Sequence, residues 1–152
     1  MRNLLMNNLK VLIVLAMTIV AASAQAASSV LRLNPSEMST MKLDSIPPWP
    51  EGVVLKGSNE HAMNVVHKGE VVVTVYAAEP ALINVSEPYP YDEFVMVLEG
   101  EVTLTSLAGD AQTYKVGESF LVPKGWQGTW DMPVKFREMI IVETKAWVAA
   151  EE

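Results

Sequence analysis

Two short runs of the chain carry glycines and a proline at fixed spacing around apolar residues. The first is Glu93-x6-Gly100, and the second is Gly117-x5-Pro123-x-Gly125. Glycine readily adopts the positive φ of a tight turn, and proline cannot donate a hydrogen bond to a β-ladder. The two runs therefore predict short strands that end at specified turns, and this constrains the fold more than the composition does.

The chain from Gly52 onward is predicted to be all-β. Strands are expected at residues 71–76, 94–98, 101–105 and 120–122, and a last long strand at 134–142, with turn-forming residues between them. The run 94–98 is apolar on both alternating faces, which predicts a strand buried between two sheets. Many short strands of this kind indicate a sandwich or a closed barrel. We expect no helix after residue 26 beyond one turn following Asn34-Pro35.

The first 26 residues have the pattern of a secretory signal peptide. Arg2 and Lys10 flank the start of the segment, residues 11–22 are almost entirely apolar, and Ala24-Gln25-Ala26 offers a small-x-small cleavage site. The apolar stretch is shorter than the about 20 residues that a membrane-spanning helix needs, and an uncleaved anchor is the alternative. We therefore predict cleavage after Ala26, a periplasmic or secreted product, and no membrane association afterwards.

Residues 27–50 are predicted to form an extended N-terminal arm, and residues 51–152 the β-barrel domain. The arm is rich in prolines, which cannot supply ladder hydrogen bonds, and it carries Trp49 among them. Two interpretations stay open: the arm packs on a partner subunit, or it packs on its own barrel.

Charge and cysteine content exclude several classes of partner and site. The formal net charge is −7, and it becomes more negative if Arg2 and Lys10 are removed. Nucleic acids and anionic membrane surfaces need clustered Lys and Arg, so we do not expect either as a partner. Because the chain has no cysteine, disulfides, thiol nucleophiles and thiolate metal ligands are excluded.

The two glycine-containing runs resemble the paired signature motifs of the cupin superfamily. Residues 89–100 and Trp126-Gln127-Gly128-Thr129-Trp130 look closer still to the cupin domain family named for (S)-ureidoglycine aminohydrolase. This resemblance spans roughly residues 49–142. It implies a single RmlC-like jelly-roll barrel, the double-stranded β-helix of cupins, with an N-terminal extended arm. Together with the proline-rich arm, it also leads us to expect a homodimer.

The resemblance also implies where a metal would bind. A typical metal-bearing cupin would show His-x-His-x3-Glu in the first motif, where this chain has Glu87, Tyr89 and Glu93, and a further histidine where it has Gly128. The aminohydrolase variant, Glu-x-His-x3-His, is matched only at Glu87. Transition metals at enzyme sites favour nitrogen ligands, so we expect no catalytic metal, and at most a weakly held divalent cation at Glu87 and Glu93.

The two histidines of the chain are not expected to form a metal site. His61 and His67 are six residues apart, which along one strand corresponds to about 20 Å. We therefore expect them not to share an ion, and we expect both to lie at the surface.

Aromatic and acidic residues are expected to meet at the mouth of the barrel. A pocket lined by aromatic side chains and a few acids suits a small apolar, cationic or sugar-like ligand. The alternative is that these aromatic residues are ordinary core and interface residues. Glu138 interrupts the apolar face of the last strand, either as an inward-facing acid or beside a bulge that resets the register. The candidate pocket residues are Glu87, Tyr89, Tyr91, Glu93, Trp126, Gln127, Trp130 and Glu138.

Three functions remain open from the sequence. The chain is expected to be an exported cupin without a catalytic metal that binds a small molecule or serves as an accessory protein. The first alternative is a small metal-assisted enzyme of the ureidoglycine aminohydrolase type, with Glu87 and Glu93 as an acid–base pair. The second alternative is a structural dimeric module. The sequence does not decide whether the chain is an enzyme.

Overall fold

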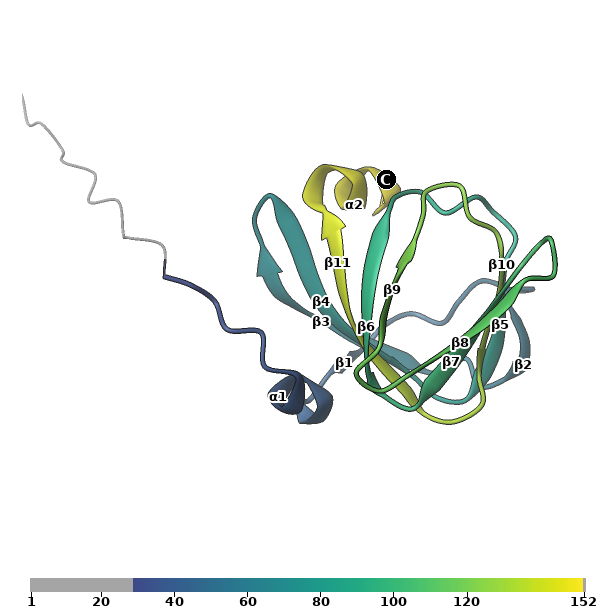
Figure 1. Cartoon of the computed structure of the whole chain (residues 1–152), viewed down its shortest axis with the longest axis horizontal. Coiled ribbons are helices and arrows are strands. Elements are labelled where there is room, and N and C mark those ends of the chain that lie inside the picture. Colours follow the sequence, from purple (N-terminus) through teal and green to yellow (C-terminus); the bar gives the residue numbers. More distant parts are fainter. Residues whose placement is uncertain (1–28, 152) are drawn as a thin grey trace, which may run out of the picture. The chain divides into compact units, whose positions relative to one another are not determined.

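Two antiparallel sheets of β-strands face one another in the computed structural model, which describes residues 29–151 (Figure 1). The predicted signal peptide lies outside the described residues. The first sheet has six strands in the order β1-β3-β4-β11-β6-β9, and the second has five in the order β2-β5-β10-β7-β8. The all-β prediction is confirmed.

The strands of the first sheet are β1 (Asp44–Ser45), β3 (His61–Lys68), β4 (Val71–Ala78), β11 (Phe136–Glu143), β6 (Glu93–Glu99) and β9 (Ser119–Val122). Those of the second are β2 (Val54–Gly57), β5 (Ala81–Val85), β10 (Gly128–Met132), β7 (Glu101–Ser106) and β8 (Ala111–Lys115). All five predicted strand segments correspond to observed strands. The last begins at Phe136 rather than Val134, because Val134 lies in a bend and is half exposed.

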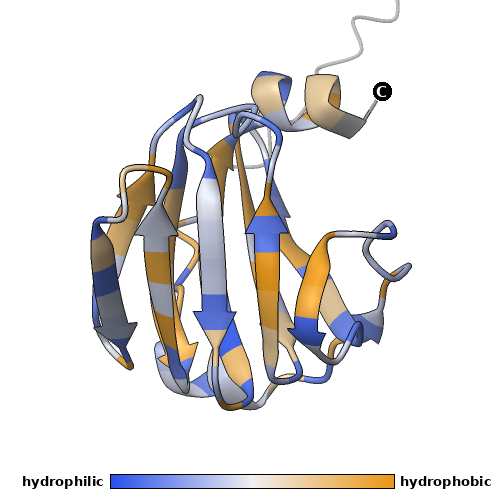
Figure 2. Ribbon diagram, turned by 90° about the vertical axis from the view of Figure 1, so that its right-hand side faces the viewer, coloured by the Kyte–Doolittle hydropathy of each residue, from blue (hydrophilic) through white to orange (hydrophobic). Residues whose placement is uncertain are grey.

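The space between the sheets is filled at one end by a hydrophobic core. Figure 2 shows hydrophobic and hydrophilic residues alternating along strands of the second sheet, as expected for a sheet with one buried face. The inward residues include Val95, Val97, Val102, Leu104, Phe120, Val122, Trp130, Met132 and Phe136.

The outer face of the first sheet is covered by the N-terminal arm. A second core cluster joins Met38 of the arm to Val75, Leu98 and Met139 of the sheet, with Phe94 and other partly buried residues packed against it. The arm therefore packs on its own barrel, as one of the two interpretations held. The doubly apolar run 94–98 was predicted to lie between two sheets. Instead, one face looks into the barrel and the other faces the arm.

A buried arginine joins the arm to the sheet. Nη1 of Arg137 donates hydrogen bonds to the carbonyl oxygens of Met38 (3.0 Å) and Met41 (2.8 Å), and Nε lies 3.8 Å from Oε2 of Glu99. Because the last carbonyl groups of a helix have no donor within the helix, this side chain stabilises the end of α1 as well as its docking on the sheet.

Two helices flank the sheets. The predicted turn after Asn34-Pro35 is α1 (Pro35–Thr40), capped by Asn34, whose Oδ1 accepts from Ser36 N. The expectation of no further helix is wrong, because Thr144–Glu151 form α2, at the end of β11 (Figure 1). Its first residue is held by the β3–β4 turn, since Thr144 donates from N to Glu70 O and from Oγ1 to Gly69 O. Within residues 29–151, neither helix is long and apolar enough to cross a membrane.

The turn between β6 and β7 should depend strictly on Gly100. Its φ is +74°, and a Cβ there would lie 2.2 Å from the carbonyl oxygen of Lys135. We expect Gly100→Ala to lower the free energy of unfolding by about 2 kcal/mol or more, measured by urea denaturation. Gly109→Ala is the control, because its φ of +90° is similar but no atom lies within 4 Å. Its cost should be about 1 kcal/mol, and equal losses in the two variants would contradict this account.

Candidate functional site

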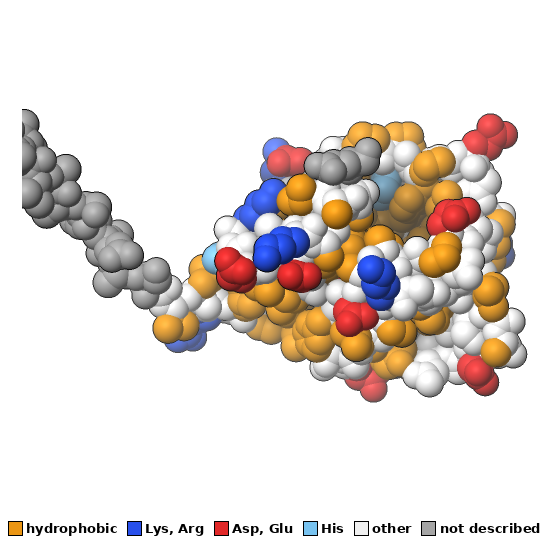
Figure 3. All heavy atoms as spheres, turned by 90° about the horizontal axis from the view of Figure 1, so that it is seen from above, with side chains coloured by type: hydrophobic (Ala, Val, Ile, Leu, Met, Phe, Trp, Pro, Cys, Tyr) orange, Lys and Arg blue, Asp and Glu red, His pale blue; other side chains and the backbone are white. Residues whose placement is uncertain are grey.

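A cavity of about 590 Å³ opens between the two sheets at the end of the barrel that carries α2. Figure 3 shows this face hollowed beside the helix, with hydrophobic side chains around the hollow. Most of its polar side chains come from the first sheet and the β5–β6 loop. Its aromatic lining residues are Trp49, Tyr76, Tyr89, Tyr91, Trp130 and Trp147.

Two buried glutamates face this cavity from neighbouring strands. Glu93 is the first residue of β6, on the same face as Val95 and Val97, and Glu138 lies on β11 opposite Val97. Each side chain is 3% exposed. The pairing of β11 with β6 shifts register between Arg137 and Glu138, so both sequence interpretations of Glu138 apply.

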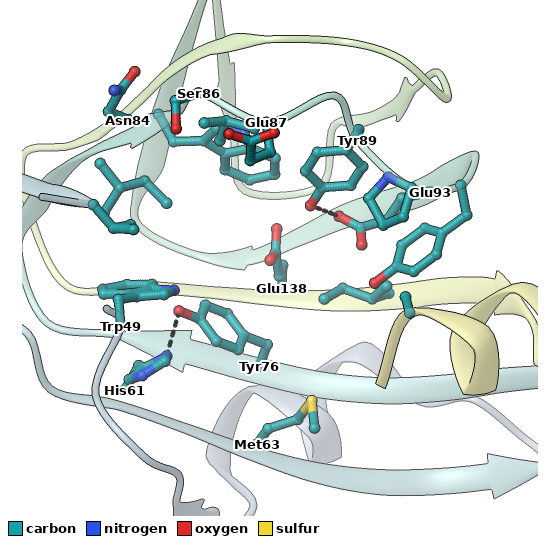
Figure 4. Close-up of a pocket in the computed structure, with 18 of the residues that line it drawn as sticks. Trp49, His61, Met63, Tyr76, Asn84, Ser86, Glu87, Tyr89, Glu93 and Glu138 are labelled. Carbon is teal, nitrogen blue, oxygen red and sulfur yellow. Dashed lines mark hydrogen bonds between the residues drawn. The ribbon is translucent and has the colours of Figure 1, made fainter. Parts of the chain in front are cut away.

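Glu93 is held by a tyrosine. The Tyr89 hydroxyl donates a hydrogen bond of 2.9 Å to Oε1 of Glu93 (Figure 4). Burial raises the pKa of Glu93 from 4.5 to about 7, although the hydrogen bond from Tyr89 lowers it. Glu93 therefore gains or loses its proton near neutral pH. Burial, followed by the charge of Glu93, raises the pKa of the Tyr89 hydroxyl, so Tyr89 remains a donor.

Glu138 has fewer hydrogen-bond partners in the described part of the chain than Glu93. Figure 4 shows its carboxyl group pointing into the cavity, between Tyr89 above and Tyr76 below. Within the described part of the chain, its buried Oε2 has no hydrogen-bond partner. Burial, and then the charge of Glu93, raise the pKa of Glu138 well above its usual range. The buried indole Nε1 of Trp130, on the opposite sheet, likewise lacks a partner among these residues.

His61 lies in the wall of the cavity, so the prediction of a surface histidine is wrong for it and right for the exposed His67. Its ring stacks on Trp49 with centroids 4.0 Å apart. Nε2 lies 2.7 Å from the carbonyl oxygen of Pro47, which can only accept, and Nδ1 lies 3.0 Å from the Tyr76 hydroxyl. In the neutral ring, Nε2 therefore carries the proton and Tyr76 donates to Nδ1.

Tyr91 and Trp147 form the rim of the cavity. Their rings stack with centroids 6.4 Å apart, and Tyr91 also meets Tyr89 edge to face at 5.8 Å. Since Trp147 lies on α2, the C-terminal helix contributes to the mouth. Glu87 lies at the same mouth but is exposed, unlike Glu93.

The structure brings most of the candidate pocket residues together. Glu87, Tyr89, Tyr91, Glu93, Trp130 and Glu138 line the cavity. Trp126 and Gln127 do not. Trp126 lines a separate, smaller cavity and meets the ring of Tyr89 edge to face, with centroids 6.5 Å apart. Gln127 Nε2 donates to the carbonyl oxygen of Ser86. Both residues precede β10, so the strand alternation that directs Trp130 into the barrel does not set the direction of their side chains.

Sequence reasoning missed several residues of the site. Trp49, His61, Tyr76 and Trp147 all line the cavity. Tyr76 could have been found, because it lies on the same face of β4 as the buried Thr74 and Ala78. In the structure it pairs with Glu138 on β11. Trp147 could not have been found, because the sequence shows no hydrophobic pattern that predicts the helix α2.

The donor atoms of the cavity do not fit the nitrogen-ligated metal site that many cupins hold. Within residues 29–151, no group of three or more His, Cys or acidic side chains could hold a metal ion. His61 already uses both ring nitrogens. At Gly128, where a ligand histidine would stand, a Cβ would lie 2.1 Å from the carbonyl oxygen of Thr105. No side chain fits there without a backbone shift.

Removing the Tyr89 hydroxyl should move the titration of Glu93. We expect Tyr89→Phe to raise the pKa of Glu93 above about 7, because the lost hydrogen bond favours the charged carboxylate. Carbon-13 NMR of the glutamate side-chain carboxyl groups as a function of pH measures this shift. Tyr114→Phe is the control, since that hydroxyl donates to Gln112 outside the cavity. An unchanged or lowered pKa in Tyr89→Phe would show that the Tyr89 hydroxyl does not stabilise the carboxylate.

Comparisons with known proteins support the cupin resemblance. The model of the EutQ-like cupin domain family matches residues 84–139, which include both predicted motifs. A search of curated proteins finds no match to the chain.

Solved structures share the fold. A DUF861 family protein of unknown function from Pseudomonas syringae has a TM-score of 0.57 at 19% identity, over 68% of this chain and 45% of that one. A cupin 2 conserved barrel domain protein from Rhodopseudomonas palustris has a TM-score of 0.53 at 8% identity, over 67% and 70%. A protein described as ethanolamine utilization protein Q from Salmonella typhimurium has a TM-score of 0.50 at 20% identity, over 68% and 94%. The chain thus spans less than half of the Pseudomonas protein, and the fold is the cupin jelly roll.

Proposed function

We propose that this chain, a member of the cupin superfamily, binds a small organic molecule in its barrel without a transition metal. The cavity of about 590 Å³ lies within the range of small-molecule sites, and aromatic walls with a few convergent polar groups are typical of them. The observation that carries the proposal is the buried Oε2 of Glu138. An unpartnered buried carboxyl oxygen costs free energy that a bound ligand can recover.

A thermal-shift screen of small molecules tests the proposal. A ligand of the cavity should raise the Tm of the full chain, because it binds the folded state only. Ala150 is exposed and lines the mouth, whereas its exposed neighbour Ala149 does not line it. Ala150→Trp should therefore reduce the ligand-induced shift, and Ala149→Trp should leave it unchanged. A screen that yields no ligand, or shifts that Ala150→Trp does not reduce, would contradict binding in the cavity.

The enzyme alternative is favoured by one observation: two carboxyl groups share the cavity, and one has a pKa of about 7. Such a group can accept or donate a proton near neutral pH. The aminohydrolase reaction would also need metal assistance. Elemental analysis of the chain purified without chelator separates the two functions, since stoichiometric manganese, iron or zinc would overturn the metal-free proposal.

Export and homodimerisation complete the proposal, and both come from the sequence. Mass spectrometry of the product from a bacterial host should find a chain that begins at Ala27. Light scattering at micromolar concentration should give the mass of a dimer. A monomer would remove the structural dimeric module from consideration without affecting ligand binding.

A further inference from the structure

The charges that line the cavity are unbalanced. Its described lining contains Glu87, Glu93 and Glu138, and no Lys or Arg. Arg137, next in sequence to Glu138, points to the opposite face of β11, where it binds the arm. Among residues 29–151, no lysine or arginine is therefore placed to compensate the two buried carboxylates.

A buried carboxylate without a cation must be neutralised in another way. In the empty cavity, protons do this. A ligand that brings its own positive charge could replace them and would supply the N–H donor that Glu138 Oε2 lacks. The aromatic residues Trp49, Tyr76 and Tyr89 line the cavity around this carboxyl group, and aromatic rings can attract cations (Figure 4).

We propose that the ligand is a small organic compound with a primary ammonium group, which donates to Glu138 and Glu93 while its apolar part packs against the aromatic walls. This inference rests on the proposed function and names its ligand class. An anionic ligand is disfavoured because its charge would lie beside the acids. A neutral ligand could pack in the cavity but would leave the carboxylates uncompensated.

Binding of such a cation should be coupled to proton release. The titratable groups around Glu138 are Glu93 from β6, Tyr76 from β4, Tyr89 from the β5–β6 loop and His61 from β3, with Glu87 and Tyr91 at the rim. Burial raises the pKa values of Tyr76 and Tyr89, so the phenols stay protonated, and the released proton comes from the glutamates. The affinity should therefore rise about tenfold per pH unit below about pH 7, where Glu93 is protonated in the empty cavity.

Three probes of nearly the same size separate the ligand classes: benzylammonium, benzyl alcohol and benzoate. We expect calorimetry of the full chain at about pH 8 to show benzylammonium binding at least about tenfold more tightly than benzyl alcohol, with benzoate the weakest. Lowering the pH should reduce the affinity for benzylammonium and leave the affinity for benzyl alcohol almost unchanged.

A matched pair of variants tests whether the preference for benzylammonium arises in the cavity. Glu138→Gln should remove most of the preference for benzylammonium over benzyl alcohol. Glu143→Gln makes the same change at an exposed position of the same strand and should preserve the preference. Circular dichroism of both variants verifies that they are folded.

The outcomes distinguish the two proposals. If benzyl alcohol or benzoate binds as tightly as benzylammonium, the ligand class is wrong while small-molecule binding stands. The same conclusion follows if Glu138→Gln keeps the preference. If none of the probes binds at millimolar concentration, the ammonium inference is overturned. If the thermal-shift screen also yields no ligand, the proposed function fails as well.

Discussion

The double variant Glu93→Gln/Glu138→Gln is expected to be more stable than the parent by about 3 kcal/mol or more at about pH 8, and about equally stable at about pH 4. Glutamine keeps the size of a protonated glutamate, and Oε1 at position 93 can still accept from Tyr89. The substitution therefore removes the cost of burying charge without opening a hole in the cavity wall.

The sign of this pH dependence follows from raised pKa values. Burial raises the pKa of Glu93 from 4.5 to about 7, so between these values the folded chain binds more protons than the unfolded chain. The contribution of Glu93 to the free energy of unfolding is therefore most favourable below about pH 4.5, and it is lost as the pH rises through about 7. Glu138, whose pKa is also raised, extends the loss to higher pH.

Urea denaturation across this pH range measures the difference between variant and parent. Glu101→Gln/Glu143→Gln serves as the control, because it removes the same number of charges from positions outside the cavity. Its stability should follow the parent within about 0.5 kcal/mol at each pH. A double cavity variant that is less stable than the parent at about pH 8 would mean that the two carboxylates stabilise the fold, contrary to this account.

Arg137→Met is expected to lower the free energy of unfolding by about 3 kcal/mol. The substitution keeps much of the apolar stem but removes the donors to the carbonyl oxygens of Met38 and Met41 and the partner of Glu99. These carbonyl groups would lose their partners, and the end of α1 would be held by the packing of apolar arm residues such as Met38 and Met41.

Lys135→Met is the matched control, because Lys135 pairs with Glu79 on an exposed part of the surface. It should change stability by less than about 0.5 kcal/mol. Hydrogen exchange adds a local readout: the amide of Met38, which donates to Asn34 O, should lose protection in Arg137→Met. Unchanged protection there would show that Arg137 does not hold the arm.

Much of the barrel could be predicted because turns and strand alternation are local properties of a sequence. Gly100 marks the end of β6, and its positive φ is a requirement that few other residues meet. The helical turn after Asn34-Pro35 could also be predicted from neighbouring residues. The faces of β6 were harder, because its outward apolar residues are covered by the arm rather than by a second sheet.

The candidate site was only partly predictable because it is assembled from distant segments. Glu93 and Glu138 could be singled out as acids in apolar strands. His61 seemed a surface residue, since nothing local shows that Trp49 stacks on it or that Tyr76 donates to it. Trp147 enters through a helix whose position depends on contacts between Thr144 and the β3–β4 turn. Such contacts are set by the tertiary fold.

The chain's four tryptophans allow the most direct test of ligand binding in the barrel. Trp49, Trp130 and Trp147 line the cavity, and Trp126 does not. The indole N–H signals can be followed by proton–nitrogen NMR during titration with benzylammonium or a ligand found by thermal shift, after assignment with Trp→Phe variants. We expect the largest shift at Trp130, whose Nε1 has no partner in the described part of the chain, shifts at Trp49 and Trp147, and the smallest at Trp126. Unchanged signals, or a shift centred on Trp126, would contradict binding in this cavity.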